Sequence, residues 1–439
     1  MFTPNNILMF MRMSVDIKFL SFLKRIYKLY KKNDKSFTFR NYIRLLFYLI
    51  RDETIRKHED KYLTNPWFPP IPSESMIKMI ESVQDKDKMF LQQIHGIRKA
   101  PTMMSVCLTR KCVNKCDFCS ARERSSGEEL TTDEWKKIFD ELNEMGVSVI
   151  SITGGEPLLR KDLLELIEYI NDDITINLRT SGHKLDVNMA SALKDAGLFS
   201  VEVGMDLFTP GSNSIKNKKD FNRSLMAIYS SNQAGLYVNA QLVIGKEYID
   251  EKKLFPLFKF LRNYGADEIK ILEPIPMGSL YYSKNNLDDI LYNNEDRERL
   301  IEIQKKANRR LFMPKISFYS CHESKDNMGC GAGIQISYIS ETGELMPCDF
   351  LPISFGNVKN EKLSDLFLNM TNKIGKPKLF RSCREFNYSI YKNKNCILPY
   401  SEADGLESIE KLNSNMNEYP GLYKRLQKTT FNKYKNKRA

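Results

Sequence analysis

The chain has 439 residues, of which 42% are hydrophobic and 28% are charged, a composition typical of a globular protein with two or three domains. It contains nine cysteines, no secretory signal pattern and no apolar run of about 20 residues, which argues against a disulfide-rich secreted protein and against a membrane span. We therefore expect a cytoplasmic protein. The net charge of +12 comes mostly from lysines spread along the chain without a nucleic-acid-binding module, which argues against a nucleic-acid partner.

Residues 1–100 are expected to form a helical extension that includes a proline-rich linker at residues 65–72. In its first part, apolar side chains recur at helical spacing opposite a row of Lys and Arg; they are Phe19, Leu20, Phe22, Leu23, Ile26, Leu29 and Tyr30. A basic amphipathic helix can either pack on the rest of the protein or lie on an anionic membrane. We favour packing, and peripheral membrane contact is the alternative.

Between residues 101 and 315, short β-branched segments alternate with amphipathic helices, which predicts βα units around a parallel sheet. The predicted strands are 104–108, 147–152, 174–179, 200–206, 237–244 and 268–273. A helix between the first two strands begins with a capping box at Thr131 and Glu134 and ends at Gly146. Six strands are fewer than the eight of a closed TIM barrel, and ligand sites of such sheets lie at the carboxyl ends of the strands.

The most specific motif follows the first predicted strand. Cys112, Cys116 and Cys119 have the spacing CxxxCxxC. A [4Fe–4S] cluster normally has four cysteine ligands, so three cysteines leave one iron open to another ligand. Structural zinc would need a fourth Cys or His at a short spacing, and the nearest later histidine is His183. The loop therefore favours an iron–sulfur cluster over zinc.

A second motif follows the next predicted strand, where Gly154, Gly155 and Glu156 precede a proline. Two glycines allow a ligand to approach the backbone closely. Together with the cysteine loop and the aromatic Phe118 before its last cysteine, this segment resembles the radical S-adenosylmethionine (radical SAM) superfamily. The resemblance implies an α/β fold with a partial (β/α)6 barrel, and S-adenosylmethionine bound at the open iron with its methionyl amine at Gly154, Gly155 and Glu156.

The same resemblance implies further cofactor contacts at the ends of later strands. They are made by Thr180 and Ser181 after the third strand, and by Asp206 and Ile244 at the ends of the fourth and fifth strands. Two positions depart from the family pattern: an Asn is commoner than Thr180 or Ser181, and Gly204 stands where a Ser is frequent. The structural alternative for all of these residues is that they only end strands and form turns.

Residues 316–400 carry a second set of cysteines. Cys330 and Cys348 flank a predicted hairpin with strands at 336–339 and 344–347 and a turn at Gly343, which resembles a small C-terminal α+β SPASM or twitch domain. The resemblance implies one auxiliary [4Fe–4S] cluster held by Cys330, Cys348 and Cys396, with Cys321 favoured over Cys383 as fourth ligand. A zinc-bound or unligated group of cysteines is the alternative. Cys107 is expected to be a core residue.

Asp349, directly after Cys348, occupies the place of a proton-accepting Asp in sulfatase-maturing family members, which makes it a candidate general base. The resemblance implies an enzyme that cleaves S-adenosylmethionine reductively and abstracts hydrogen from a peptide or protein side chain, with an electron donor such as flavodoxin or ferredoxin. The alternatives are a radical SAM enzyme acting on a lipid or small molecule, and a non-catalytic zinc-binding protein. Residues 401–439 are expected to form a basic tail with a frayed end.

Overall fold

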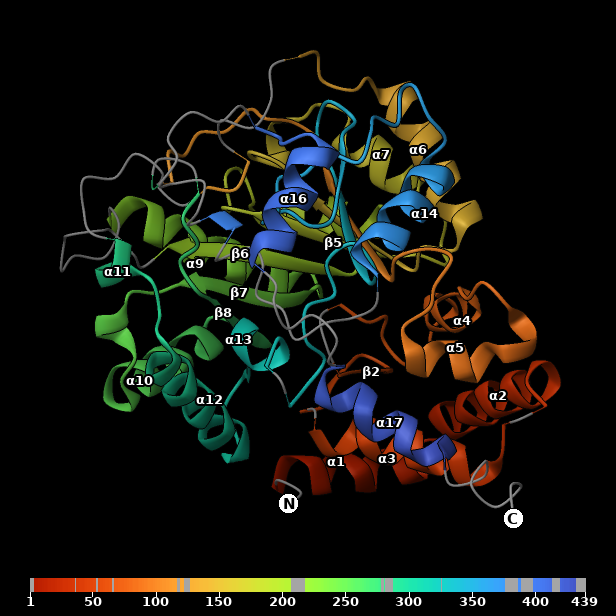
Figure 1. The fold of residues 1–439 in the computed structure, drawn as a ribbon. Coiled ribbons are helices and arrows are strands. Elements are labelled where there is room, and N and C mark those ends of the chain that lie inside the picture. Colours follow the sequence, from red (N-terminus) through yellow and green to blue (C-terminus); the bar gives the residue numbers. More distant parts are fainter. Residues whose placement is uncertain are drawn as a thin grey trace.

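The computed structural model shows one nine-stranded sheet covered by helices and a separate two-stranded sheet (Figure 1). The α/β class predicted from the sequence is confirmed. The structure describes all residues except 1–3, 36, 53, 65–66, 117–118, 122–126, 207–217, 278–279, 281–286, 325, 376–385, 388–397, 413–418 and 432–439.

The large sheet has the strand order β11-β10-β3-β4-β5-β6-β7-β8-β9, and all neighbouring strands are parallel except the pair β10 and β11. The six predicted strands are all present, each within two residues of its expected bounds. They are β3 (Met103–Cys107), β4 (Val149–Thr153), β5 (Thr175–Thr180), β6 (Ser200–Asp206), β7 (Tyr237–Val243) and β8 (Glu268–Leu272). Among the described strands, β9 and β11 are the two edges, so the barrel is open, as expected.

Helices between consecutive strands cover the outside of this sheet, because each βα unit returns the chain to the same end of the next strand. They are α6 (Thr132–Met145), α7 (Leu163–Tyr169), α8 (Val187–Asp195), α9 (Lys218–Gln233), α10 (Glu251–Asn263), α11 (Leu287–Ile290) and α12 (Asn294–Arg309). The predicted capping box of α6 is confirmed at Thr131 and Glu134, and Gly146 ends the helix with a φ of 94°. The inner face of α6 buries Trp135, Phe139 and Leu142 against the sheet.

The sheet continues across the predicted boundary between residues 315 and 316. That boundary falls inside β9 (Lys315–Phe318), which pairs with β8. On the opposite edge, β10 (Ile336–Ile339) pairs in parallel with β3 and turns at Gly343 into β11 (Leu345–Met346), which confirms the hairpin. The C-terminal cysteine region is therefore hydrogen-bonded to the first strand of the barrel. Its remaining described helices are α13 (Tyr319–His322), α14 (Leu363–Ile374) and α16 (Glu402–Leu412).

The N-terminal extension is helical, as expected. It contains α1 (Pro4–Val15), α2 (Ile17–Asn33), α3 (Phe39–Asp52), a hairpin of β1 (Arg56–His58) and β2 (Lys61–Leu63), α4 (Glu74–Glu81) and α5 (Met89–His95). In α2, Phe19, Phe22, Ile26 and Tyr30 are buried, which confirms packing for this part of the apolar stripe. Leu20 is exposed. No helix in the described part of the chain is long and apolar enough to cross a bilayer.

Part of the expected basic tail, residues 421–431, is helical and packed against the N-terminal extension. They form α17 (Gly421–Phe431), which packs against α3 and α5. Leu422, Tyr423 and Leu426 are buried there, two of them in the same apolar cluster as Phe22 and Ile26 of α2. The basic side chains dominate the composition of this segment, but its apolar residues recur at helical spacing and supply a packing face.

The linker after the hairpin contacts the barrel through Trp67, whose ring lies 4.8 Å from that of His322 and 5.3 Å from that of Tyr319. His322 is almost completely buried, at 4% exposure. Burial, with Lys315 and Lys270 nearby, lowers the pKa of His322 from 6.5 to about 3. The imidazole is therefore neutral in the folded protein over the whole neutral and mildly acidic range.

We predict that His322 makes the protein less stable as the pH falls below 6.5. The unfolded chain then binds a proton that the folded chain does not accept, so the free energy of unfolding decreases by up to about 1.4 kcal/mol per pH unit. The experiment is urea unfolding of wild type and His322→Phe between pH 7.5 and about 4.5. The difference between the two proteins in free energy of unfolding should change with pH. Parallel curves for wild type and His322→Phe would contradict the prediction.

Candidate active site at the carboxyl ends of the strands

A cavity of about 440 Å³ lies at the carboxyl ends of the parallel strands. The cysteine loop forms one wall and the last residues of β4, β5 and β6 form another. Among the residues predicted from the sequence, the cavity brings together Cys112, Cys116, Cys119, Gly154, Gly155, Thr180, Ser181 and Asp349. Two motifs and a residue from the C-terminal region, far apart in the sequence, therefore meet in one site.

The three cysteines of the loop differ in exposure. Cys112 is exposed, and Cys116 and Cys119 are half-buried. The backbone N–H of Asn114 donates to the sulfur of Cys112 at 3.4 Å. Within the described residues, no three Cys, His, Asp or Glu side chains converge closely enough to hold a metal ion. Phe118 lies outside the described residues, so its expected role remains a prediction.

The two glycines of the second motif are required by a contact between backbones. Gly155 N–H donates to the carbonyl of Thr109 at 2.7 Å, and Glu156 N–H donates to that of Lys111 at 2.8 Å. A Cβ atom on Gly155 would lie 2.4 Å from the carbonyl oxygen of Lys111, and one on Gly154 would lie 2.6 Å from that of Thr109. The glycines thus let the end of β4 lie directly against the segment that leads to Cys112. Both glycines also line the cavity, and the approach of a ligand to their backbone remains a prediction.

Glu156 lies behind the wall of the cavity. Its side chain is fully buried and is absent from the cavity wall. One carboxylate oxygen accepts from the hydroxyl of Thr180 at 2.6 Å, and the other accepts from the backbone N–H and the hydroxyl of Ser181 at 2.9 and 2.6 Å. Glu156 therefore joins the ends of β4 and β5 and orients Thr180 and Ser181, which do line the cavity. The expected contact of its carboxylate with a methionyl amine remains a prediction.

The remaining predicted strand-end contacts have different outcomes. Ile244 is fully buried away from the cavity, and its carbonyl accepts from the hydroxyl of Tyr292. The cavity is lined instead by Gln241 and Val243. Alternate residues of a strand face the same side, so a residue adjacent to Val243 points away from the cavity. Asp206 ends β6, but its side chain lies outside the described residues.

A buried charge network forms the floor of the cavity. The guanidinium of Arg179 on β5 lies 2.9 Å from the carboxylate of Asp349 and 3.2 Å from that of Glu202 on β6. Glu202 is also 3.3 Å from the ammonium of Lys270 on β8. Burial works against the charge of Glu202, but Lys270 and Arg179 outweigh it and lower its pKa. Burial lowers the pKa of Lys270 in spite of Glu202. Arg179 thus orients the candidate base Asp349 at the cavity wall.

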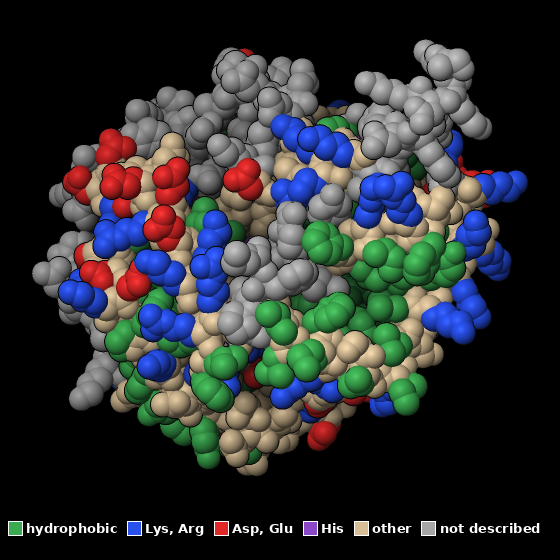
Figure 2. Space-filling view, turned by 90° about the horizontal axis from the view of Figure 1, so that it is seen from below, with side chains coloured by type: hydrophobic (Ala, Val, Ile, Leu, Met, Phe, Trp, Pro, Cys, Tyr) green, Lys and Arg blue, Asp and Glu red, His purple; other side chains and the backbone are tan. Residues whose placement is uncertain are grey.

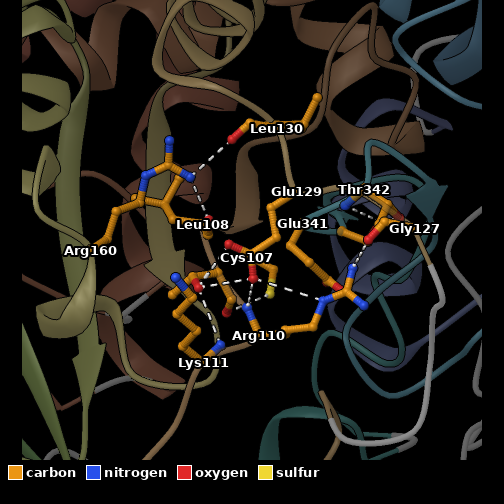
Figure 3. A network of polar contacts seen from close by, with 12 residues as sticks. Cys107, Leu108, Arg110, Lys111, Gly127, Glu129, Leu130, Arg160, Glu341 and Thr342 are labelled. Carbon is orange, nitrogen blue, oxygen red and sulfur yellow. Dashed lines mark hydrogen bonds and ion pairs between the residues drawn. The ribbon is translucent and has the colours of Figure 1, made fainter.

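A second polar network holds the start of the cysteine loop, as Figure 3 shows. The carboxylate of Glu129 accepts from the hydroxyl of Thr109 at 3.0 Å and from the backbone N–H of Arg110 at 2.8 Å. The side chain of Arg110 lies 3.6 Å from Glu341 in the turn between β10 and β11. Arg160 donates to the carbonyl of Leu108 at 2.6 Å. These residues could not be recognised from the sequence, because isolated charged residues do not form a motif.

Cys107 lies in the centre of Figure 3 and is fully buried, as expected of a core residue. Burial, together with Glu341, raises the pKa of its thiol. Cys330 and Cys348 lie near Tyr319, and Cys321 follows Tyr319 by two residues on α13. Burial raises the pKa of Tyr319, and the nearby Cys348 and Cys330 contribute to this shift. None of the seven described cysteines forms a disulfide bond, and Cys383 and Cys396 lie outside the described residues.

The sequence of residues 106–255 matches the family model of the radical SAM superfamily. The chain is 28% identical over 249 residues to PqqA peptide cyclase of Bradyrhizobium diazoefficiens, covering 55% of this chain and 64% of that protein. It is 25% identical over 299 residues to AdoMet-dependent heme synthase of Methanosarcina barkeri, covering 62% of this chain and 84% of that protein. Among solved structures, SuiB of Streptococcus suis bound to the precursor peptide SuiA is similar, with a TM-score of 0.51 and 17% identity over 64% of this chain and 67% of that chain.

Residues 106–255 therefore form a radical SAM domain, which confirms the resemblance carried by the two motifs. Proteins of this family use a [4Fe–4S] cluster and S-adenosylmethionine, the cofactors expected from the sequence. The similarity to SuiB supports the fold. The chain matches less than two thirds of the length of PqqA peptide cyclase, and the curated relatives differ in what they act on.

We predict that Gly155→Ala prevents normal loading of the cysteine loop with iron. The new methyl group would lie 2.4 Å from a backbone oxygen, so the segment 109–111 must move and the cysteines after it must move too. The measurement is iron content after anaerobic reconstitution, with circular dichroism as a test of folding. Gly204→Ala is the matched control, because its Cβ would meet only the carbonyl of Thr180 at an ordinary 3.6 Å. Equal iron contents in the two variants would contradict the prediction.

We also predict that Glu202→Gln destabilises the protein by about 3–5 kcal/mol, because it leaves the buried ammonium of Lys270 without its nearest carboxylate. The matched control is Glu165→Gln, which removes an ion pair with Lys136 at the surface and should change stability far less, because water screens exposed ion pairs. Both free energies are measured by urea unfolding. A Glu202→Gln variant as stable as the control would show that the network does not support the barrel.

Proposed function

We propose that the protein is a radical SAM enzyme that modifies a peptide or protein side chain. The observation that carries the proposal is the meeting of three cysteines, a glycine-lined backbone, two oriented hydroxyls and Asp349 around one cavity. The names of two similar proteins support the substrate class: PqqA peptide cyclase, and SuiB bound to a precursor peptide. The proposal also includes a protein that donates single electrons, such as flavodoxin or ferredoxin.

The residues present fit an iron–sulfur cluster with three protein ligands. Cys112, Cys116 and Cys119 lie on one short loop and all border the cavity, and thiolates are the ligands of such clusters. The described wall of the cavity contains no other Cys and no His that could serve as a fourth ligand. When bound, the cluster and S-adenosylmethionine would supply the one-electron chemistry that removes a hydrogen atom from an unactivated carbon.

The protein itself would bind and orient the reactants. The hydroxyls of Thr180 and Ser181 are held by Glu156 and are positioned to hydrogen-bond a polar cofactor. On the other side of the cavity, Arg179 holds the carboxylate of Asp349, which we propose as the group that accepts a proton from the substrate. Met205, Leu272 and Phe350 supply apolar wall that limits access of water.

We further propose one auxiliary [4Fe–4S] cluster near the cavity. Cys330 and Cys348 lie around the same tyrosine, Tyr319, and Cys348 directly precedes Asp349 on the cavity wall. Cys321 is two residues from Tyr319 and is our favoured fourth ligand. Cys396 completes the proposed set. A cluster here would adjoin the substrate side of the cavity, where it could accept an electron or hold the substrate.

We predict about eight irons per chain after anaerobic reconstitution, from two four-iron clusters. Replacing Cys112, Cys116 and Cys119 together by Ala should remove about four, and Cys348→Ala alone should also remove about four. Wild type and Cys348→Ala should both release 5′-deoxyadenosine slowly when supplied with dithionite and S-adenosylmethionine, and the triple variant should not. Zinc in place of iron would overturn the proposed reaction, and only four irons in wild type would overturn the auxiliary cluster.

The substrate class is tested separately. The reconstituted enzyme is incubated with synthetic copies of any short peptide that is encoded beside its gene, and the peptide masses are compared before and after reaction. A mass change that requires S-adenosylmethionine supports peptide modification. Modification of an added lipid or small molecule, with every peptide unchanged, would overturn it in favour of the alternative substrate class.

A further inference from the structure

Positive charge is concentrated at the start of the chain. Residues 1–50 contain ten Lys and Arg and two Asp, a net charge of +8 out of the +12 of the whole protein. These residues build α1, α2 and α3, which lie together at one end of the molecule beside α17 (Figure 1). The three helices thus give this end of the molecule a strongly basic character.

The same helices expose large apolar side chains. Of the nineteen large hydrophobic residues that are exposed in the described chain, ten lie between Ile7 and Phe47. They include Ile7, Phe10 and Met11 on α1, and Phe39, Ile43 and Phe47 at four-residue spacing along α3. We call these six side chains the docking face. Figure 2 shows hydrophobic side chains gathered over this end of the molecule, with Lys and Arg along the margin.

These six side chains keep 47–61% of their surface exposed, although the ring of Phe39 also packs edge-on against that of Tyr27. Each helix already buries another side against the molecule: Met9 and Met13 do so in α1, and Tyr42 does so in α3. A helix at the surface of a globular protein normally presents a polar outer side to water. Here both the inner and outer sides are apolar, and an exposed apolar surface of this kind marks a contact with something else.

Basic residues on α2 and α3 are available for an external anion. Lys24, Lys28, Lys32 and Arg40 are exposed, and none of them forms an ion pair within the described residues. Neighbouring basic residues do have partners, as Lys18 pairs with Asp60 and Arg25 with Glu74. Apolar side chains flanked by uncompensated cations match the two layers of an anionic bilayer, the acyl boundary and the charged headgroups.

We propose that the docking face binds the surface of an anionic lipid bilayer, with α1 and α3 lying in the plane of the interface. Attachment would orient the whole enzyme, because α1 is fixed to the barrel. The side-chain amide of Asn5 donates to the carbonyls of Asn308 and Arg310 at the end of α12, at 2.9 and 3.1 Å. The charge of the face distinguishes a bilayer from a second copy of this chain, since two copies would bring like charges together.

The experiment is flotation of the full-length protein with vesicles, which needs no loaded cofactor. One set contains phosphatidylcholine with about 30% phosphatidylserine, and the other contains phosphatidylcholine alone. The wild type should float with the first set only. Lys28→Gln combined with Lys32→Gln should lower the partition coefficient about thirtyfold, since each charge near an anionic surface contributes about fivefold. Phe10→Ser combined with Phe47→Ser should lower it at least about tenfold.

Matched controls separate the docking face from general changes in charge or apolar area. Lys137→Gln with Lys259→Gln removes two exposed charges elsewhere, on α6 and α10. Met226→Ser with Leu368→Ser removes side chains that are 54% and 48% exposed, against 55% and 47% for Phe10 and Phe47. Both control variants should bind like wild type. Because the Lys28 and Lys32 changes affect only exposed charges, they test the proposal even if the apolar variant folds poorly.

Three results would overturn the proposal. The first is no flotation of wild type, and the second is equal flotation with neutral and anionic vesicles. The third is a dimer in light scattering that Phe10→Ser with Phe47→Ser dissociates, without any binding to vesicles; the docking face would then be an interface between two copies. None of these results bears on the iron content or on the proposed reaction.

Discussion

Two backbone segments that lie closer together than any side chain would allow determine the geometry of this site. The segment Gly154–Glu156 at the end of β4 is hydrogen-bonded to Thr109 and Lys111, three residues or fewer before the cysteine loop. This contact places the loop over the carboxyl ends of the strands. The same turn directs Glu156 toward β5, where it orients Thr180 and Ser181. One steric requirement at two glycines therefore aligns the expected cluster ligands with the polar wall opposite them.

The interior of the barrel contains charged side chains that pair with side chains of opposite charge. Arg179, Lys270 and Lys315 pair with Glu202, Asp349 and Glu268, and these residues come from β5, β6, β8, β9 and the segment after β11. Buried charges of this kind are stable only when each has an opposite partner, and their mutual attraction fixes side-chain orientation. A site built on such a network can present a carboxylate such as Asp349 in one orientation without help from the bound molecule.

Local patterns in the sequence were sufficient to predict the fold and to find the two motifs. Alternating β-branched runs located β3 to β8, and the capping box at Thr131 located α6, because both depend on residues close together in the chain. The contact of Arg179 with Asp349 joins residues 170 positions apart, and no local pattern reports it. The direction of Glu156 was also not predictable, since a motif fixes where a carboxylate lies in the chain and not which neighbour it meets. Periodicity likewise indicated an apolar side of α2 without showing that α17 packs against the same cluster.

The position of β10 beside β3 has a consequence for the nascent chain. The ribosome synthesises β3, the first strand of the barrel, about 230 residues before β10, the strand that pairs with the outer edge of β3. At about 5–20 residues per second, translation leaves that edge unpaired for roughly 10–50 seconds. An unpaired strand edge is a template for pairing with other chains, and this one ends next to the cysteine loop. A cluster that is inserted into that loop before β10 has been synthesised would therefore enter a protein in which this edge of the sheet is still unpaired.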